Sequence, residues 1–271
     1  MIDKFISEEM KYFQPILQRQ ENATEELRNS WRNETVAQRL ERISLETYDL
    51  CNGTVLHGLF KGLKLNKNTW WGKSDLGAQC LGLYEKEILD FISAHEPFET
   101  FLDIGAADGY YAAGMLHSKM AKKAICFEIS EDGQVAIKEN WVINNSPGQL
   151  TIYGEANRQS ITSIASTLPQ NSLALVDIEG FEFSLFTPEV VALLNQITIL
   201  IEIHNWVDDF PTKYSTLLRE LDKNFEVSII RNSVRNTHDI ELLRSYTDDN
   251  RLLVSSERRP CLMRFLHLKP K

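Results

Sequence analysis

Apolar and polar residues follow two different patterns along the chain. Between residues 5 and 50, apolar positions recur with helical spacing among charged, Asn and Gln residues, which predicts amphipathic helices. Beyond residue 98, short apolar runs alternate with helical patterns. We predict strands in seven of these runs, at 100–104, 124–129, 150–153, 173–178, 197–203, 227–230 and 263–268.

Helices are expected between these runs, at 110–120, 133–142, 188–194 and 213–221. Thr187 and Pro188 mark one helix start, with a hydroxyl cap followed by proline at the first helical position. Strands that are apolar on both faces are typical of a sheet that helices cover on both sides. The pattern therefore predicts an α/β fold with a doubly wound, mostly parallel sheet of seven strands, whose ligands bind at the carboxyl ends of the strands.

The chain is expected to fall into two parts, because strand patterns begin only near residue 98. We assign residues 1–80 to an N-terminal helical extension with a loop-rich connector, and residues 81–271 to the sheet domain. The connector contains turn signals and the adjacent Trp70 and Trp71, and we interpret it as a lid or an oligomerisation element. The helices before it are expected to pack on the sheet domain or to join two subunits of a homo-oligomer.

Composition narrows the classes of partner. The formal net charge of the 271 residues is -9, which offers no basic footprint for a phosphate backbone, so we predict that nucleic acid is not a partner. No run approaches the roughly 20 apolar residues of a membrane helix, and the first ten residues are too acidic for a signal peptide. We therefore expect a cytoplasmic protein without a membrane span.

The stretch FLDIGAADGYY, residues 101–111, ends an apolar run at Asp103 and then turns at Gly105 and Gly109. A dinucleotide-binding turn needs a glycine at the position of Ala107, where the backbone approaches a pyrophosphate. Asp108 follows, and its carboxylate at a helix N-terminus would repel that pyrophosphate. A cofactor without phosphates that carries a sulfonium and an ammonium group fits this turn, so we predict S-adenosyl-L-methionine.

Acids at the ends of the next two runs suit the same ligand. Glu128 closes the run AICFEIS, where an acid accepts hydrogen bonds from both ribose hydroxyls in a nucleotide-binding sheet. Glu155 follows the third run, where we expect it to accept from the adenine amino group. The full set of residues that we predict to bind the cofactor is Asp103, Gly105, Ala106, Asp108, Gly109, Glu128, Ile129 and Glu155.

Four ionisable residues follow the fourth and fifth runs. LALVDIEGF contains Asp177 and Glu179, which share one side if the strand continues that far, and ITILIEIHNW contains Glu202 and His204. Buried ionisable groups are costly unless they are paired or functional. We therefore predict that these four residues form the catalytic site, at the edge where the carboxyl ends of the strands meet.

These segments resemble the FkbM-like family of class I S-adenosylmethionine-dependent methyltransferases. The resemblance rests on FLDIGAADGYYA, CFEIS, LVDIEGFEFSLF and LIEIH, with LGLYEKEI before the first strand, and it covers about residues 80–205. It implies a Rossmann-like methyltransferase sheet and O-methylation, commonly of a sugar hydroxyl. One departure is Ala107, where the family often has Asn.

The residues and the resemblance together predict an O-methyltransferase that acts on a sugar or glycoconjugate. His204 is the candidate base, because the ordinary pKa of histidine suits neutral pH. The alternative is a Mg²⁺ or Mn²⁺ ion held by Asp177, Glu202 and His204. The residues that we expect to contact the acceptor are Trp70, Trp71 and Tyr84. A lipid, natural-product or protein acceptor stays open, as does a domain that binds without catalysis.

Overall fold

The computed structural model describes residues 2–259 and 263–271, and seven strands form one sheet in the order β3-β2-β1-β4-β5-β7-β6. The pairs from β3 to β5 are parallel, and β7 runs antiparallel to β5 and β6. The predicted α/β fold with a Rossmann-like, mostly parallel sheet is confirmed. The strands are β1 (Phe98–Ile104), β2 (Ala121–Phe127), β3 (Gln149–Tyr153), β4 (Ser172–Val176), β5 (Thr198–Ile203), β6 (Phe225–Ile230) and β7 (Arg264–Pro270).

Helices cover both faces of the sheet. On one side lie α5 (Lys86–Ser93), α6 (Tyr110–His117) and α7 (Glu131–Ile143). On the other side lie α8 (Arg158–Ala165), α9 (Glu182–Leu185), α10 (Pro188–Leu193) and α11 (Phe210–Leu221). Side chains alternate along each strand, so Phe101 and Leu175 join one hydrophobic cluster while Leu102 and Val176 join the other. This two-sided burial explains the continuous apolar runs.

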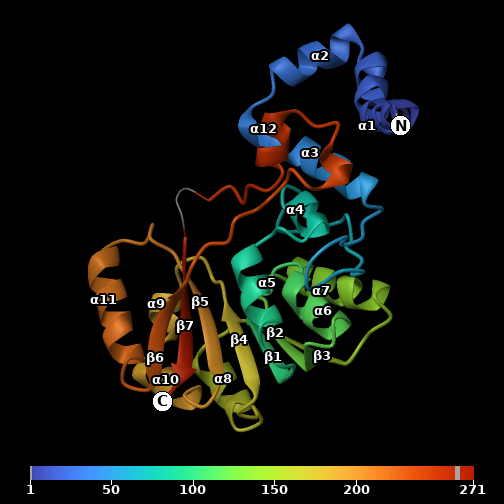
Figure 1. Cartoon of the computed structure of the whole chain (residues 1–271). Helices are drawn as coiled ribbons and strands as arrows, with labels where there is room; N and C mark the ends of the chain where they lie inside the picture. Colours follow the sequence, from blue (N-terminus) through green and yellow to red (C-terminus); the bar gives the residue numbers. More distant parts are fainter. Residues whose placement is uncertain (1, 260–262) are drawn as a thin grey trace.

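The N-terminal helices differ in how they pack. Helices α1 (Ile2–Asn22) and α2 (Glu25–Arg32) stand away from the sheet, whereas α3 (Val36–Leu50) lies beside α4 (Leu76–Leu81) and α12 (Asp248–Leu253) (Figure 1). A capping box between Thr35 and Gln38 starts α3, which buries Leu40 and Ile43 in the hydrophobic cluster shared with α5 and α6. Of the two arrangements predicted for the N-terminal helices, packing on the sheet domain therefore describes α3.

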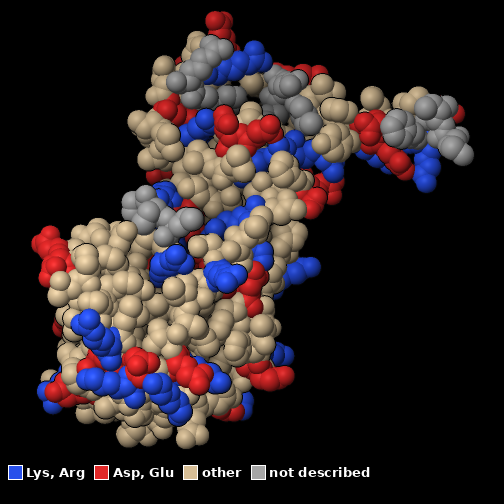
Figure 2. Space-filling view, turned by 60° about the vertical axis from the view of Figure 1, so that its left-hand side comes forward, with Lys and Arg blue, Asp and Glu red and all other residues tan. Residues whose placement is uncertain are grey.

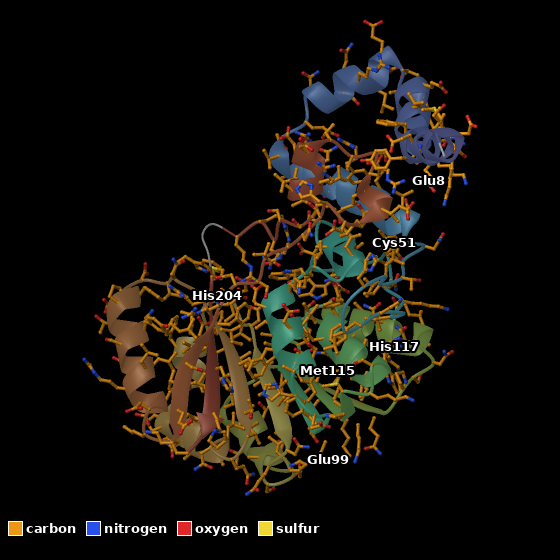
Figure 3. All side chains as sticks on the ribbon, in the orientation of Figure 1. Glu8, Cys51, Glu99, Met115, His117 and His204 are labelled. Carbon is orange, nitrogen blue, oxygen red and sulfur yellow. The ribbon has the colours of Figure 1, made fainter. Side chains whose placement is uncertain are left out.

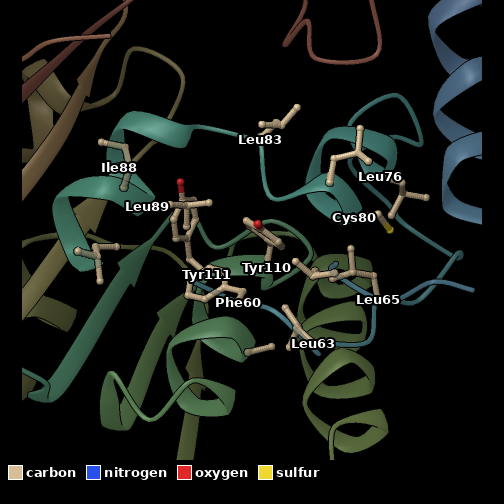
Figure 4. Close-up of a cluster of buried hydrophobic side chains, with 14 of the residues drawn as sticks. Phe60, Leu63, Leu65, Leu76, Cys80, Leu83, Ile88, Leu89, Tyr110 and Tyr111 are labelled. Atoms are coloured by element: carbon tan, nitrogen blue, oxygen red, sulfur yellow. The ribbon is translucent and has the colours of Figure 1, made fainter. Parts of the chain in front are cut away.

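The connector is tied to the sheet domain. The side chain of Asn144, in the turn after α7, exchanges two hydrogen bonds of 2.8 Å with the backbone of Lys64. Phe60 is fully buried in the cluster of Figure 4, together with side chains of α4 (Leu76–Leu81) and α6. Hydrophobic packing thus continues across residue 80, where we predicted the boundary between two parts.

A long excursion between β6 and β7 reaches the N-terminal helices (Figure 1). It contains a 3-10 helix, η1 (Glu241–Leu243), and α12 (Asp248–Leu253). Arg39 of α3 donates a hydrogen bond of 2.7 Å to Asn250 of α12, and the hydroxyls of Thr47 and Tyr246 lie 3.0 Å apart. We call α3, α4 and residues 231–259 the cap, because together they lie over the carboxyl ends of the parallel strands (Figure 1).

The surface mixes charges. Acidic and basic side chains are interspersed over the face in Figure 2. Exposed apolar side chains gather on α1, where Ile6, Met10 and Leu17 are 49%, 58% and 50% exposed. Within residues 2–259 and 263–271, no helix is both long and apolar enough to cross a membrane.

Candidate functional site

A cavity of about 310 Å³ opens at the carboxyl ends of the parallel strands. The loops after β1, β2, β3 and β4 line it, together with the connector and the cap. Eight lining residues are acidic: Asp75, Glu85, Asp103, Asp108, Glu128, Glu155, Asp177 and Glu179. None of the described residues that line it is Lys, Arg or His. The cavity therefore favours a ligand that carries positive charge.

The turn after β1 brings this strand close to its neighbours. Gly105 has a φ of +90°, and a Cβ there would lie 1.7 Å from the backbone oxygen of Asp177, so only glycine fits. Ala107 has a φ of +47°, a left-handed conformation that asparagine adopts more readily than alanine. Its backbone N–H donates to Glu128 Oε2 at 2.9 Å, and Gly109 is the N-cap residue of α6.

Glu128 is held rigidly at the end of β2. Its Oε1 accepts from the backbone N–H of Ser130 at 2.8 Å, and burial raises the pKa of its carboxyl group. The indole of Trp70 lies beside Glu128, because a Cβ added to Gly133 would be 2.3 Å from Trp70 Nε1 and 2.7 Å from Glu128 Cγ. Asp108 Oδ1 accepts from the backbone N–H of Trp70 at 2.8 Å, so Asp108 fixes the connector to the turn.

The other residues predicted to bind the cofactor also reach the cavity, apart from Gly109. Asp103 is 3% exposed, and its Oδ2 has no hydrogen-bond partner among the described residues. Burial raises the pKa of Asp103 to about 8. Ile129, which is 74% exposed, and Glu155 line the part of the cavity formed by the loops after β2 and β3, beside Ala106, Gly154 and Ala156. We call Glu128, Ile129, Gly154, Glu155 and Ala156 the β2–β3 end of the cavity.

The four predicted catalytic residues meet at one point. His204 is 1% exposed and lies at the end of β5, facing the cap (Figure 3). Its Nε2 lies 3.3 Å from Asp177 Oδ1, 3.7 Å from Glu202 Oε2 and 3.8 Å from Glu179 Oε2. β4 ends at Val176 and Glu179 has a φ of +53°. The two acids therefore reach His204 from a turn, because the strand does not continue as far as Glu179.

A fifth residue, which sequence reasoning missed, organises this group. Glu182 is fully buried, and its two oxygens accept from the backbone N–H groups of Gly180 and His204, each at 2.9 Å. Both oxygens also lie 3.2 Å from His204 Nδ1. Glu182 therefore ties the turn after β4 to the end of β5. A buried acid between two phenylalanines in GFEFS was the available signal.

The carboxylates around His204 decide its charge. Burial opposes the charged imidazolium, but contacts with Asp177 and Glu182 outweigh burial and raise the pKa of His204 to about 9. Both ring nitrogens face acids, so each carries a proton at neutral pH. His204 also lies behind the cavity wall, whereas Asp177 and Glu179 line it. These features differ from the prediction that His204 is a base near neutral pH.

A second charged group joins the cap to the site. Glu85 is 2% exposed, and it accepts from the Tyr111 hydroxyl and from Arg259 Nη2, each at 2.7 Å. Arg259 Nη1 donates to Glu202, and burial raises the pKa of Glu85 to about 8. Sequence reasoning missed Arg259, because it lies 174 residues from Glu85.

The structure also changes the set of residues that could hold a metal ion. Ligand atoms of Asp177, Glu179 and His204 lie within 4.8 Å of one another, and so do those of Glu85, Asp177 and Glu202. The predicted set joined Glu202 to His204 instead. In the second group the Arg259 guanidinium already contacts two of the three carboxylates, as a cation would.

All three residues that we expected to contact the acceptor line the cavity. Trp70 and Trp71 meet edge to face, with their ring centroids 5.6 Å apart. Tyr84 contacts Tyr110 in the same way at 5.7 Å. Other lining residues that sequence reasoning missed are Asp75, Gln79, Tyr110, Tyr111 and Phe181. The lining residues next to the cap lie at the start of α4, before α5 and at the start of α6, and we call them the cap end of the cavity: Asp75, Gln79, Tyr84, Glu85, Tyr110 and Tyr111.

No protein-family model and no curated protein matches the sequence. Among solved structures, a dimethyladenosine transferase from Plasmodium falciparum is 16% identical, with 70% of this chain and 62% of that chain covered and a TM-score of 0.45. A ribosomal-protein methylase from Lactobacillus delbrueckii subsp. bulgaricus is 13% identical, with 77% and 85% covered and a TM-score of 0.44. A Streptococcus pneumoniae protein described as a tRNA methyltransferase, solved with S-adenosyl-L-methionine, is 12% identical, with 68% and 72% covered and a TM-score of 0.41.

These comparisons concern the fold. The FkbM-like family stays a prediction, and the chain spans less than two thirds of the Plasmodium falciparum protein. The names of these proteins also overturn the predicted partners. We had predicted a sugar hydroxyl as the acceptor and had excluded nucleic acid. One of the three proteins is named for adenosine, one for tRNA and one for a ribosomal protein. The exclusion of nucleic acid therefore does not stand.

Proposed function

We propose that the chain is an S-adenosylmethionine-dependent methyltransferase that acts on a hydroxyl oxygen. The observation that carries this proposal is the acid-lined cavity at the carboxyl ends of the strands, with Glu128 at the end of β2. A dinucleotide would bring its pyrophosphate against Asp108, with no basic side chain among the described lining residues to neutralise it. A ligand with a sulfonium and an ammonium group meets favourable charge in the same cavity.

The residues of the cavity suit each part of this cofactor. Glu128 has acceptor capacity beyond its two backbone bonds and would accept from the ribose hydroxyls. The unpartnered oxygen of Asp103 would accept from an ammonium group. Ile129 offers an exposed apolar side chain to a nucleobase. When bound, the cofactor supplies a methyl group activated by a positively charged sulfur.

Asp177 is the residue best suited to take the proton of the acceptor hydroxyl. It lines the cavity, and its Oδ1 lies 3.3 Å from His204 Nε2. The protonated His204 orients Asp177, and Glu182 fixes His204 from the other side. General-base help of this kind is worth about 10²- to 10⁴-fold. His204 thus acts as a positioning residue and Asp177 as the base.

Oxygen is favoured over nitrogen for a chemical reason. A hydroxyl must lose its proton as it is methylated, so a charged carboxylate at the cavity wall is useful to it. The turn after β4 reads DIEG, in place of the NPPY-type turn that resembles amino-group methyltransferases. A sugar hydroxyl is one member of the acceptor panel below, beside the other hydroxyl classes.

The experiment supplies S-adenosyl-L-methionine with a labelled methyl group and a panel of monosaccharides, nucleosides, short RNAs, phenols and peptides. We expect labelled methyl ethers from one class and full activity in EDTA. Exclusive labelling of nitrogen would contradict the hydroxyl acceptor. Activity lost in EDTA and restored by Mg²⁺ or Mn²⁺ would replace Asp177 as base by a metal ion on the acids around it. Cofactor binding without turnover on any class would favour a binding domain.

A further inference from the structure

Charge is distributed unevenly along the chain, and the connector is basic. Residues 51–74 contain four lysines, one histidine and no acid, although the whole chain has a net charge of -9. The lysines of the connector are all exposed: Lys61, Lys64, Lys67 and Lys73. An acidic protein therefore carries a local basic surface.

Packing fixes the direction of these side chains. Leu63 and Leu65 are 0% and 5% exposed, and they belong to the hydrophobic cluster of Figure 4. Lys61 and Lys64, close to them in sequence, are exposed. Backbone hydrogen bonds of 2.8 Å also join Leu63 and Leu65 to residues 53–55. The connector is therefore an ordered loop that presents its lysines to solvent.

The connector runs beside α7 and ends at the cavity. Lys64 is bound through its backbone by Asn144, directly after α7. Near the start of α7, a Cβ added to Gly133 would be 2.3 Å from Trp70 Nε1. At about 1.5 Å per residue, the path along α7 from Asn144 to Gly133 is roughly 16 Å long. It ends at the cavity wall, which Trp70 and Trp71 line.

Three of the four lysines lack an acidic partner. Lys67 pairs with Asp49 at 2.6 Å. Lys61, Lys64 and Lys73 form no ion pair with any residue that the structure describes. We call these three the lysine strip. Unpaired charges on an ordered loop suit a partner that carries several negative charges.

A second basic segment adjoins the strip. A Cβ added to Gly62 would be 3.3 Å from His117 Nε2, so His117 at the end of α6, labelled in Figure 3, lies beside the connector. Lys119 follows shortly after His117 and is exposed. Two separate parts of the chain therefore contribute basic side chains to one surface.

We propose that the lysine strip, with Trp70 and Trp71, binds single-stranded RNA as the methyl acceptor, a proposal that rests on the methyltransferase function above. Lysines bind backbone phosphates, and exposed indole rings stack on unpaired bases. Trp70 and Trp71 are 38% and 45% exposed. The acids of the cavity repel phosphates, so the backbone stays outside, on the strip.

RNA fits the proposed chemistry as well as the charge. Each internal nucleotide of RNA carries a 2′ hydroxyl, which DNA lacks. Its oxygen would bond to the methyl carbon as the carbon–sulfur bond breaks, and its proton would pass to Asp177. A lipid surface fits less well, because Asp108 binds the Trp70 backbone at 2.8 Å and the Trp70 indole lies against α7, which leaves it no freedom to enter a bilayer.

Fluorescence anisotropy of a labelled oligouridine RNA, without cofactor and over a range of salt concentrations, tests the strip. Three phosphate contacts on a single strand contribute about -2 to the slope of log K against log salt. Lys61→Gln/Lys64→Gln/Lys73→Gln should remove this contribution and weaken binding about 10- to 100-fold near 0.1 M salt. The matched control, which should bind like the wild type, removes the same charge from three exposed lysines on or next to α11 and β7: Lys213, Lys223 and Lys269.

The variant Trp71→Ala separates stacking from charge. It should weaken RNA binding about tenfold and leave the salt slope unchanged. Heparin and vesicles of phosphatidylserine and phosphatidylcholine are the competing probes. Tighter binding of either probe than of RNA, or an RNA affinity that Trp71→Ala does not change, overturns the assignment to RNA. A strip variant with wild-type RNA affinity and melting temperature overturns the surface.

Calorimetry with S-adenosylhomocysteine keeps the two proposals apart. A protein that binds S-adenosylhomocysteine but no RNA loses the strip and keeps the proposed function. One that binds RNA through the strip but no S-adenosylhomocysteine loses the proposed function and keeps the RNA surface. With labelled cofactor, the strip variant should raise the KM for RNA at least tenfold and leave the affinity for S-adenosylhomocysteine unchanged. Labelling of another acceptor class and not of RNA overturns RNA as the acceptor.

Discussion

The two ends of the cavity are built in opposite ways. At the β2–β3 end, Glu128 accepts from the backbone N–H groups of Ser130, two residues away, and of Ala107, 21 residues away in the neighbouring turn. At the cap end, Glu85 and Arg259 meet from positions 174 residues apart, and burial raises the pKa of Glu85 to about 8. At the β2–β3 end, backbone groups hold the binding side chain in place. At the cap end, buried ionisable groups next to Asp177 are electrostatically unfavourable. The difference indicates that binding and chemistry are separated along the cavity.

The largest effect should come from removing the proposed base. Asp177→Asn keeps the shape of the side chain but cannot accept a proton, so we expect turnover to fall by about 10²- to 10⁴-fold. The affinity for S-adenosylhomocysteine should change little. Steady-state kinetics and calorimetry measure the two quantities separately. Asp49→Asn is the control, because Asp49 is an exposed acid paired with Lys67. Equal losses of turnover and affinity would show that Asp177 also binds the cofactor, and this would contradict the separation of binding from chemistry.

The second largest effect concerns stability. Glu182→Gln removes one partner of a fully buried ion pair with His204, and such breaks cost about 3–5 kcal/mol. Urea unfolding at neutral pH measures this change in the free energy of unfolding. Glu189→Gln is the matched control on a surface helix, α10, and should change little. A stable Glu182→Gln protein would show that the pair does not hold the turn after β4 to β5.

Glu128 should produce the reverse of the Asp177 result. Glu128→Ala removes the acceptor for the ribose hydroxyls, which costs roughly 1.5–3 kcal/mol of binding free energy for charge-assisted hydrogen bonds. The affinity for S-adenosylhomocysteine should therefore fall about 10- to 150-fold. Turnover at saturating cofactor should stay close to wild type. An unchanged affinity would remove Glu128 from the cofactor site.

The pH dependence of stability follows from the raised pKa values. Because the pKa of His204 rises from its ordinary 6.5 to about 9, folding is stabilised below about pH 6.5 and loses this contribution as the pH rises through 9. Asp103 and Glu85, each raised to about 8, add in the same direction, since the folded state keeps protons that the unfolded chain releases. We expect the unfolding free energy, measured by urea unfolding, to fall steadily as the pH rises from 6.5 to 9.

The variant His204→Gln separates these contributions. Its unfolding free energy should depend less on pH between 6.5 and 9 than that of the wild type. Turnover of the wild type should fall above about pH 9, when His204 loses its proton, and this limb should be absent in the variant. A variant with the wild-type pH profile would contradict the role of His204 in positioning Asp177.

The sequence predicts the β2–β3 end better than the cap end for a physical reason. Strand periodicity and a glycine turn are local signals, so the sheet, Gly105 and Glu128 could be placed from short windows. The contacts of Glu85, Asp75 and Arg259 depend on how the excursion between β6 and β7 folds back. No local pattern encodes that path. Distant packing, rather than propensity, sets this part of the site.

The charge state of His204 could not be predicted from the sequence either. Its segment LIEIH signals an ionisable residue at a strand end, and that location is correct. Its pKa depends on Glu182 and Asp177, which approach from the loop after β4. A residue that reads as a neutral base in isolation becomes an imidazolium when two carboxylates meet it.

The central claim is that this cavity binds S-adenosyl-L-methionine and not a dinucleotide. Calorimetric titration of the wild-type chain with S-adenosylhomocysteine and, separately, with NADH tests it most directly. We expect S-adenosylhomocysteine to bind with micromolar to sub-millimolar affinity, and NADH not to bind, because Asp108 opposes its pyrophosphate and no described lining residue is basic. Tight binding of NADH, or no binding of S-adenosylhomocysteine, would contradict the account.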